Sequence, residues 1–242
     1  RDIIKMPLSW GGKRGFTTDN FVDAFQQMNF MNILKNSLII TCVSVFLIIL
    51  FSSMAAYIFV RKAWKINQII FMVMLFSMVI PFQVVMIPLI SIYGGTFGIL
   101  NHRATLIFMH LGFSVSMAVF MFHGFIKGGV PISLEEAAQI DGAGPIQLFF
   151  KVTIPLLTPT IFFVMITSII SGFQVFDVIY MMIGKTNPAY ANTQTVVMLF
   201  YRQAFDYGYK GYAAAISILI FAVIMLVTVI QMIGQKKWVN YD

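Results

Sequence analysis

Residues 135–155 read EEAAQIDGAGPIQLFFKVTIP and form a polar segment between two long apolar runs. Ser133 can cap a helix at this point, and the carboxylates of Glu135 and Glu136 favour the positive end of its dipole. The Gly-Ala-Gly-Pro that follows is predicted to end the helix, because glycine permits a positive φ and proline cannot extend a helix. A second short amphipathic segment, residues 146–154, leads to the next apolar run. The stretch therefore predicts a short helix, a sharp turn and a second short helix along a membrane face.

The composition excludes a water-soluble domain. Of the 242 residues, 59% are hydrophobic and only 10% are charged, and the mean hydropathy is +0.87. A soluble domain carries about 25% charged residues, so this chain could not cover a surface that faces water. Its net charge is +7, but the Lys and Arg residues lie mostly at the ends of apolar runs. That placement indicates membrane topology and contacts with lipid headgroups rather than nucleic-acid binding.

Five long apolar runs dominate the chain. They cover roughly residues 36–60, 67–92, 104–126, 156–183 and 213–234. Each run exceeds the ~20 residues that a helix needs to cross the hydrocarbon core of a bilayer. The alternation typical of barrel strands is absent, and backbone polar groups in lipid must be satisfied within the segment, so the runs are predicted to be helices. The predicted fold class is an all-α integral membrane protein with five transmembrane helices.

The flanking charges predict the orientation. Dense groups of basic residues lie on one side if all five runs cross, namely Arg61, Lys62 and Lys65, Lys127 and Lys151, and Lys236 and Lys237. The positive-inside rule makes that side cytoplasmic. Residue 1 then lies outside, and we expect one further transmembrane helix upstream, giving six. The expected organisation is an external segment 1–35, a transmembrane domain 36–234 with a cytoplasmic loop 131–155 and an external loop 184–211, and a cytoplasmic tail 235–242.

Two prolines, Pro81 and Pro88, fall within the second apolar run. A proline removes one backbone hydrogen bond and clashes with the preceding turn of a helix. The prolines predict either an ordinary kink near the outer end of the helix or a break that shapes the wall of a transport pathway.

Residues for metal binding or catalysis are few. Cys42 is the only cysteine, and His102, His110 and His123 do not pair at close helical spacing, so neither a metal site nor a catalytic site is expected. The sequence contains no Gly-x-x-x-x-Gly-Lys-Ser/Thr phosphate loop. The chain is therefore predicted not to be an enzyme and to bind no cofactor of its own.

Asp177 is the only acidic residue within an apolar run. A charge in the membrane interior costs about 2.5–3.5 kcal/mol on insertion scales, so such a residue is a functional candidate. The helical period would place Gln174 and Asp177 on a similar face, with Ser171 below them and Tyr180 nearby. Sugars need polar groups that bind hydroxyls and an aromatic ring face, and these four residues offer both. The alternative is an interfacial aspartate paired across helices.

Glu136, Ala137 and Ala138, followed by Gly142 and then by an aliphatic-x-aliphatic-Pro ending at Pro155, resemble the EAA loop of permeases of binding-protein-dependent ABC importers. The resemblance implies that this loop is a coupling helix, which docks in a cleft of an ATP-binding subunit. The implied coupling residues are Glu135, Glu136, Ala137, Ala138, Asp141, Gly142, Ala143 and Pro155.

The resemblance extends over about residues 16–242, although Val152 and Ile154 replace the usual Ile and Leu of the EAA loop. Several segments are similar to maltose-type, carbohydrate-transporting permeases. Residues 36–38, 55–61 and 80–88 look like one partner of the pair, whereas residues 173–180, 211–215 and 237–241 look like the other. Both assignments therefore stay open.

The resemblance implies a membrane subunit of an ATP-driven importer that forms half of the pathway for a sugar or oligosaccharide. The implied partners are a second homologous permease, a dimer of ABC ATPases that carries ATP and Mg, an extracytoplasmic solute-binding protein and membrane lipid, with no nucleic acid. The external loop is a plausible docking surface for the binding protein. The implied location is the bacterial cytoplasmic membrane. The alternatives are an ABC permease for a non-sugar solute and a channel or secondary transporter.

Overall fold

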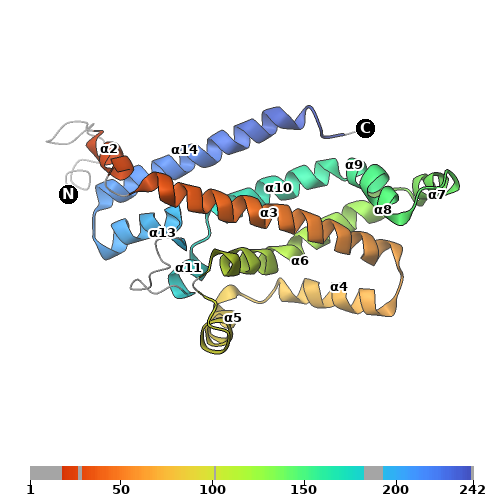
Figure 1. Ribbon diagram of the computed structural model, residues 1–242, viewed down its shortest axis with the longest axis horizontal. Coiled ribbons are helices and arrows are strands. Elements are labelled where there is room, and N and C mark those ends of the chain that lie inside the picture. Colours follow the sequence, from red (N-terminus) through yellow and green to blue (C-terminus); the bar gives the residue numbers. More distant parts are fainter. Residues whose placement is uncertain (1–17, 27–28, 101, 183–192, 241–242) are drawn as a thin grey trace.

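The computed structural model describes residues 18–26, 29–100, 102–182 and 193–240. The described part of the chain consists of helices and their connections, with no strand among them (Figure 1). This confirms the predicted all-α fold class.

Four apolar runs form the long helices of a bundle. They are α3 (Phe30–Arg61), α6 (Arg103–Gly129), α10 (Thr158–Phe173) with α11 (Asp177–Met182), and α14 (Lys210–Gln235). By length and composition, four segments of these helices could each cross a membrane, and the described chain holds up to five such spans if the bent pair α4–α5 counts as one. The helices lie lengthwise beside one another (Figure 1), and α3 packs along both α6 and α10.

The second apolar run is broken rather than gently kinked. Helix α4 (Lys65–Ser77) ends before Pro81, and α5 (Phe82–Leu89) continues into the π-helical segment η2 (Ile90–Thr96) at an angle of 102° to α4. Pro81 is the N-cap of α5, which fits a residue that has no N–H to give to a helix. The structure therefore shows a break in the helix at Pro81 rather than a kink near its outer end.

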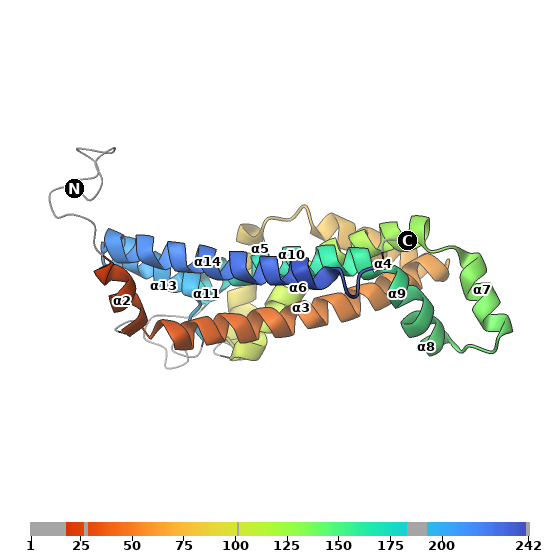
Figure 2. The same ribbon diagram turned by 90° about the horizontal axis from the view of Figure 1, so that it is seen from above.

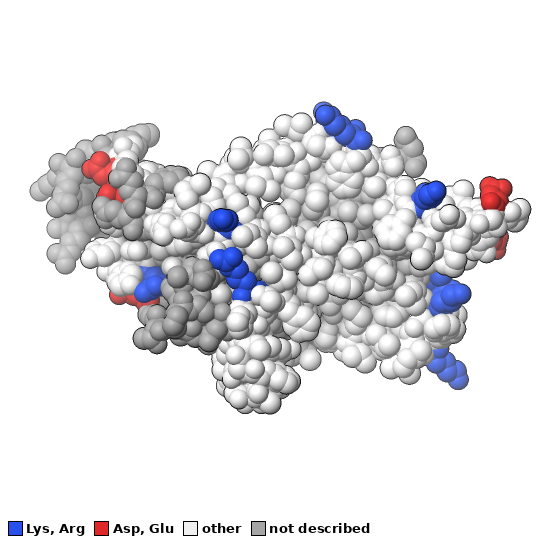
Figure 3. Space-filling model, in the orientation of Figure 1, with Lys and Arg blue, Asp and Glu red and all other residues white. Residues whose placement is uncertain are grey.

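The interior is a series of buried clusters along the long axis. One cluster near the 131–155 loop includes Ile48, Val119 and Phe122, whereas another near the opposite end includes Phe30 and Ile216. The lateral surface carries many large exposed apolar side chains, as expected of a protein that faces lipid or a partner helix. On the face shown in Figure 3, acidic groups gather at the two ends, and the broad surface between them carries only scattered basic groups.

The polar stretch forms a helical hairpin at one end of the bundle. It comprises α7 (Ile132–Ile140), α8 (Pro145–Leu148), the π-helical segment η3 (Phe149–Thr153) and α9 (Ile154–Leu156). Figure 2 shows α7 projecting beyond the ends of the long helices, with α8 beside the end of α3. The short helix, turn and second helix are thus confirmed. The prediction that Ser133 caps the helix is wrong, because Pro131 is the N-cap and Ser133 lies within the first turn.

The opposite end holds α2 (Asp19–Gln26), α13 (Val196–Tyr201) and the π-helical segment η4 (Arg202–Asp206). Helix α2 packs on α14, where the Tyr212 hydroxyl donates a hydrogen bond to Asp23 Oδ2 at 2.8 Å. The predicted external loop 184–211 therefore contains helical structure from Val196 onward, while its residues 184–192 lie outside the described residues.

Candidate functional site

The turn after α7 is fixed by one glycine. Gly142 has a φ of +86°, a conformation that side chains with a Cβ rarely adopt. Its N–H donates to the carbonyl of Gln139 at 3.0 Å, and the N–H of Ala143 donates to the carbonyl of Ala138 at 2.9 Å. This pair of bonds is the Schellman motif, which satisfies the last carbonyls of a helix. The hairpin therefore has a defined shape rather than that of a loose loop.

The tip of the hairpin presents apolar side chains. Ile140 is 86% exposed and Ile146 is 75% exposed, on the two sides of the turn. Glu136, Ala137 and Asp141 are exposed beside them, whereas Ala138 and Ala143 are half-buried. Exposed aliphatic residues rimmed by charges are typical of a protein contact surface.

Glu135 points into the protein, in contrast to its neighbour Glu136. It is 4% exposed and forms an ion pair with Arg61, with 3.0 Å between Arg61 NH2 and Glu135 Oε1. The Arg61 Nε also donates to both carboxylate oxygens at 3.1 Å. The hydroxyls of Tyr57 and Thr153 each donate to the same carboxylate at 3.3 Å. One buried carboxylate thus joins α3, α7 and η3.

Arg61 extends this connection to α6. Its NH2 group donates to the carbonyl of Val130, which follows the last residue of α6, at 2.8 Å. Sequence reasoning did not predict this pairing, because residues 61 and 135 are far apart in the chain and no local pattern connects them. We call Tyr57, Arg61, Glu135 and Thr153 the buried polar cluster.

Pro155, the last of the predicted coupling residues, is half-buried in α9. Its carbonyl accepts hydrogen bonds from Thr158 Oγ1 at 2.8 Å and from Asn240 Nδ2 at 3.5 Å. The backbone N–H of Asn240 in turn donates to Thr158 Oγ1 at 2.9 Å. The C-terminal segment therefore packs against the point where the hairpin enters α10.

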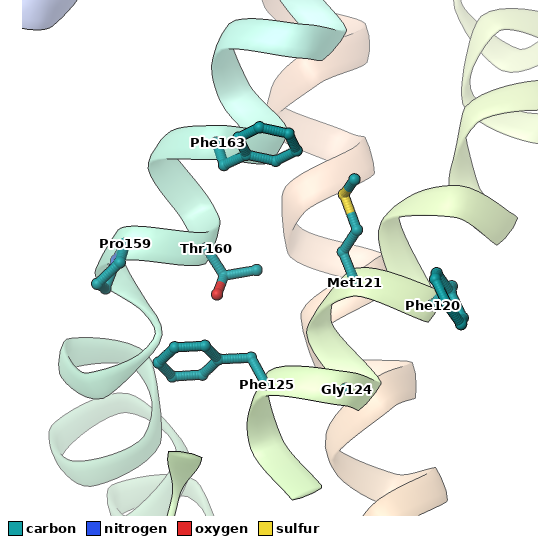
Figure 4. A pocket seen from close by; sticks show the side chains of 7 residues that line it. All are labelled: Phe120, Met121, Gly124, Phe125, Pro159, Thr160 and Phe163. Atoms are coloured by element: carbon teal, nitrogen blue, oxygen red, sulfur yellow. The ribbon is translucent and has the colours of Figure 1, made fainter. Parts of the chain in front are cut away.

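Three cavities follow one another along α6, the first two between α6 and α10 and the third between α6, α5 and α11. The first, of about 510 Å³, lies nearest the hairpin and is lined mainly by apolar side chains (Figure 4). The second, of about 220 Å³, shares Met121 with the first, and the third, of about 230 Å³, shares Phe113 with the second. The three cavities are therefore neighbours along α6.

The cavities differ in polarity, and the middle cavity is the most polar of the three. The middle cavity is lined by the hydroxyl-bearing residues Ser114, Thr167, Ser168 and Ser171. The third cavity is lined by His110, Gln174 and Asp177 together with aromatic and aliphatic residues.

The four residues predicted to contact substrate are distributed over this region. Gln174 and Asp177 share the third cavity, and Ser171 lines the middle one. The reasoning that placed them on one helical face is wrong, since α10 ends at Phe173 and α11 begins at Asp177. A change of chain direction, rather than the helical period, brings Gln174 and Asp177 together.

Tyr180 belongs to an aromatic group beside the third cavity. Its ring stacks on Phe176 with 5.2 Å between ring centroids, and it packs edge-on against Tyr201 at 4.9 Å. Phe205 continues the group, 5.0 Å from Tyr201. The Tyr201 hydroxyl donates to the Tyr180 hydroxyl at 3.4 Å, and this hydrogen bond raises the pKa of Tyr201 above its ordinary value.

Among the described residues, no group of three or more His, Cys, Asp or Glu side chains could hold a metal ion. The chemistry that the described site offers is hydrogen bonding and ring stacking.

Most of the chain matches one protein family. Residues 48–239 match the family described as "Binding-protein-dependent transport system inner membrane component". The chain belongs to this family. The match includes the hairpin, the buried polar cluster and all three cavities. The family description also agrees with the several helices that could span a membrane.

Several relatives in this transport family carry names that refer to sugars. The chain is 44% identical to the probable starch degradation products transport system permease protein AmyC of Thermoanaerobacterium thermosulfurigenes over 142 residues, which cover 59% of this chain and 51% of that protein. It is 37% identical to the melibiose/raffinose/stachyose import permease protein MelC of Bacillus subtilis over 140 residues, 58% of this chain and 50% of the relative. The chain thus spans about half the length of these curated relatives.

The fold of this family member is also found in a solved transporter. A bacterial ABC transporter involved in the import of the acidic polysaccharide alginate matches with a TM-score of 0.78 and 18% identity, over 94% of this chain and 86% of that one. A second structure, the alginate transporter in complex with an alginate pentasaccharide-bound periplasmic protein, matches with a TM-score of 0.75 and 18% identity, over 92% and 83%. At this identity the likeness establishes the fold, which is that of an ABC transporter permease.

Proposed function

We propose that the chain forms half of the translocation pathway of an ATP-driven ABC importer for a sugar or oligosaccharide. A second homologous permease completes the pathway, and a dimer of ABC ATPases hydrolyses ATP with Mg on separate chains. An extracytoplasmic solute-binding protein delivers the sugar. The hairpin faces the cytoplasm of a bacterium, in keeping with the basic residues near it.

The hairpin tip carries this proposal. Ile140 and Ile146 are largely exposed at a turn whose shape is fixed by Gly142, which suits docking into a cleft of the ATPase. Glu136 and Asp141 supply charges for basic groups of that partner. Because Glu135 ties the hairpin to α3 through Arg61, the hairpin can transmit ATPase closure to the bundle as a rigid body.

The cavities along α6 support a pathway for polar solutes. Serine, threonine and glutamine side chains can bind sugar hydroxyls, and aromatic rings can cover the apolar face of a sugar. We propose that Ser171, Gln174, Asp177 and Tyr180 contact the substrate as it passes. The names of the relatives favour a sugar over a non-sugar solute.

Reconstitution of the full-length chain tests the proposal. The chain would be placed in proteoliposomes with its partner permease, ATPase and binding protein, and uptake of labelled maltotriose, raffinose and glutamine would be measured with and without ATP. We expect ATP-dependent uptake of at least one of the two sugars. Uptake of glutamine alone would support the non-sugar alternative, and sugar uptake driven by an ion gradient without ATP would support a secondary transporter.

A further inference from the structure

His110 is a buried residue whose ring nitrogens have no hydrogen-bond partner among the described residues. The residue lies on α6 and is 7% exposed. Buried polar atoms are normally paired, because leaving one unpaired costs about 1–3 kcal/mol. Two unpaired nitrogens on one ring therefore make His110 a candidate to hydrogen-bond a water molecule or a ligand.

Two hydroxyls on α3 share this property. Thr41 Oγ1 and Ser44 Oγ are buried and also lack partners among the described residues. They are three residues apart and so share one side of their helix. Thr41 and His110 approach each other at Gly172 of α10, where a Cβ atom would come within 2.8 Å of Thr41 Oγ1 and 3.1 Å of His110 Cε1. The absence of a side chain at Gly172 therefore permits this close polar arrangement.

His110 also lines the third cavity, together with Gln174 and Asp177, which carry groups of complementary chemistry. A neutral imidazole has one donor and one acceptor, the Gln174 amide has both, and the Asp177 carboxylate has acceptors only. A sugar hydroxyl donates and accepts at once, so neighbouring hydroxyls of one ring match this combination.

Aromatic side chains on the remaining walls of the cavity can pack against the apolar faces of a sugar ring. Phe82 and Phe113 meet edge to face with 5.1 Å between centroids, and Phe176 connects the cavity to the aromatic group that contains Tyr180. The cavity volume is about 230 Å³, below the ~300–1,000 Å³ typical of pockets for larger ligands. The cavity therefore has room for a single sugar ring.

We propose that His110, Gln174 and Asp177 form a binding subsite for one pyranose ring, in which His110 hydrogen-bonds the ring hydroxyls. The proposal rests on the proposed function and adds His110 to it, a residue for which the sequence predicted no metal or catalytic role. His110 is thus assigned to substrate specificity and not to a metal.

The test compares His110→Ala, His110→Gln and the control His123→Ala in the reconstituted full-length transporter. His123 lies on the same helix but stacks on Phe71, with 4.1 Å between ring centroids, and does not line the cavity. Uptake of maltotriose, of raffinose and of monodeoxy analogues of each would be measured at saturating binding protein. Size-exclusion chromatography would verify that each complex assembles.

We expect His110→Ala to reduce uptake of the transported sugar about five- to tenfold, as the loss of one or two hydrogen bonds would. Wild type should discriminate against at least one deoxy analogue, and His110→Ala should lose that discrimination, which a purely structural role would not change. His110→Gln, which keeps a donor and an acceptor, should restore part of it, and His123→Ala should match wild type. If His110→Ala transports both sugars and discriminates among analogues as wild type does, this subsite is wrong while the proposed function stands. If wild type takes up neither sugar with ATP, the proposed function and the subsite are both wrong.

Discussion

Replacing Glu135 by glutamine tests whether the buried polar cluster joins the hairpin to the bundle. Glutamine has nearly the same shape as glutamate but carries no charge. The Arg61 guanidinium, whose side chain is 12% exposed, would then remain buried without its counter-charge. The adjacent Glu136→Gln is the matched control, because Glu136 lies on the same helix and is exposed.

The expected loss of stability can be set from the geometry. Two opposite charges about 4 Å apart attract by about 4 kcal/mol in an effective dielectric of ~20. Removing one partner of a buried ion pair costs about 3–5 kcal/mol in measured cases, because the other charge is left uncompensated. At about 2–4 °C per kcal/mol for a chain of this size, Glu135→Gln should lower the melting temperature by roughly 6–20 °C. For the exposed Glu136→Gln we expect a change in unfolding free energy within about 0.5 kcal/mol.

The assay combines thermal unfolding of the full-length chain in mild detergent with transport and ATP hydrolysis by the reconstituted complex. Glu135→Gln should have a lower melting temperature than wild type. At temperatures where this variant remains folded, its complex should hydrolyse ATP but take up less sugar. Glu136→Gln should melt like wild type and weaken the stimulation of the ATPase by the loaded binding protein. Equal melting temperatures for the two variants, together with unchanged transport by Glu135→Gln, would refute the role given to the buried ion pair.

Substitutions at three further positions test other parts of the structure. Gly142→Ala should lower the free energy of unfolding by about 1 kcal/mol, because of the positive φ at this position, and should reduce uptake. Gly142→Arg should abolish transport while the chain still inserts, and normal uptake by this variant would contradict the coupling role. Gly144→Ala is the control, because Gly144 has a φ of −75°. Asp177→Asn should change uptake or sugar preference, and unchanged kinetics across the sugars would leave this residue with a structural role. Gly172→Ala should destabilise the bundle by about 1–3 kcal/mol in thermal unfolding, since its Cβ would lie 2.7 Å from an α3 side chain; Gly112→Ala on α6, with open space around it, should not.

The sequence was informative where the physical cause is local. Long uncharged apolar runs can satisfy their backbone only as helices, so four of the five runs could be predicted as near-continuous spans, although α3 begins at Phe30, ahead of the predicted run. The turn at Gly142 was also predictable, because the residue that must adopt a positive φ and the proline that blocks extension are only a few positions apart.

The sequence was uninformative where the cause is a contact between distant segments. Pro81 is compatible with a kink or a break, and packing around it decides between them. The break after Phe173 carries no proline, so the apolar run was read as continuous up to Ile183. The pairing of Arg61 with Glu135 and the burial of His110 depend on how α3, α6 and α10 meet, and neither follows from spacing along one helix.

The connectivity of α6 and α10 links the hairpin to the cavities. Helix α6 carries His110 at the third cavity and ends beside Val130, whose carbonyl binds Arg61. Helix α10 leaves the hairpin after Pro155 and ends next to Gln174 at the same cavity. The two helices that line the first two cavities are therefore the two that enter and leave the hairpin, while Glu135 holds the hairpin to α3. A displacement of the hairpin by a partner would move the cavity walls directly, so coupling needs no separate chain of side chains between the two sites.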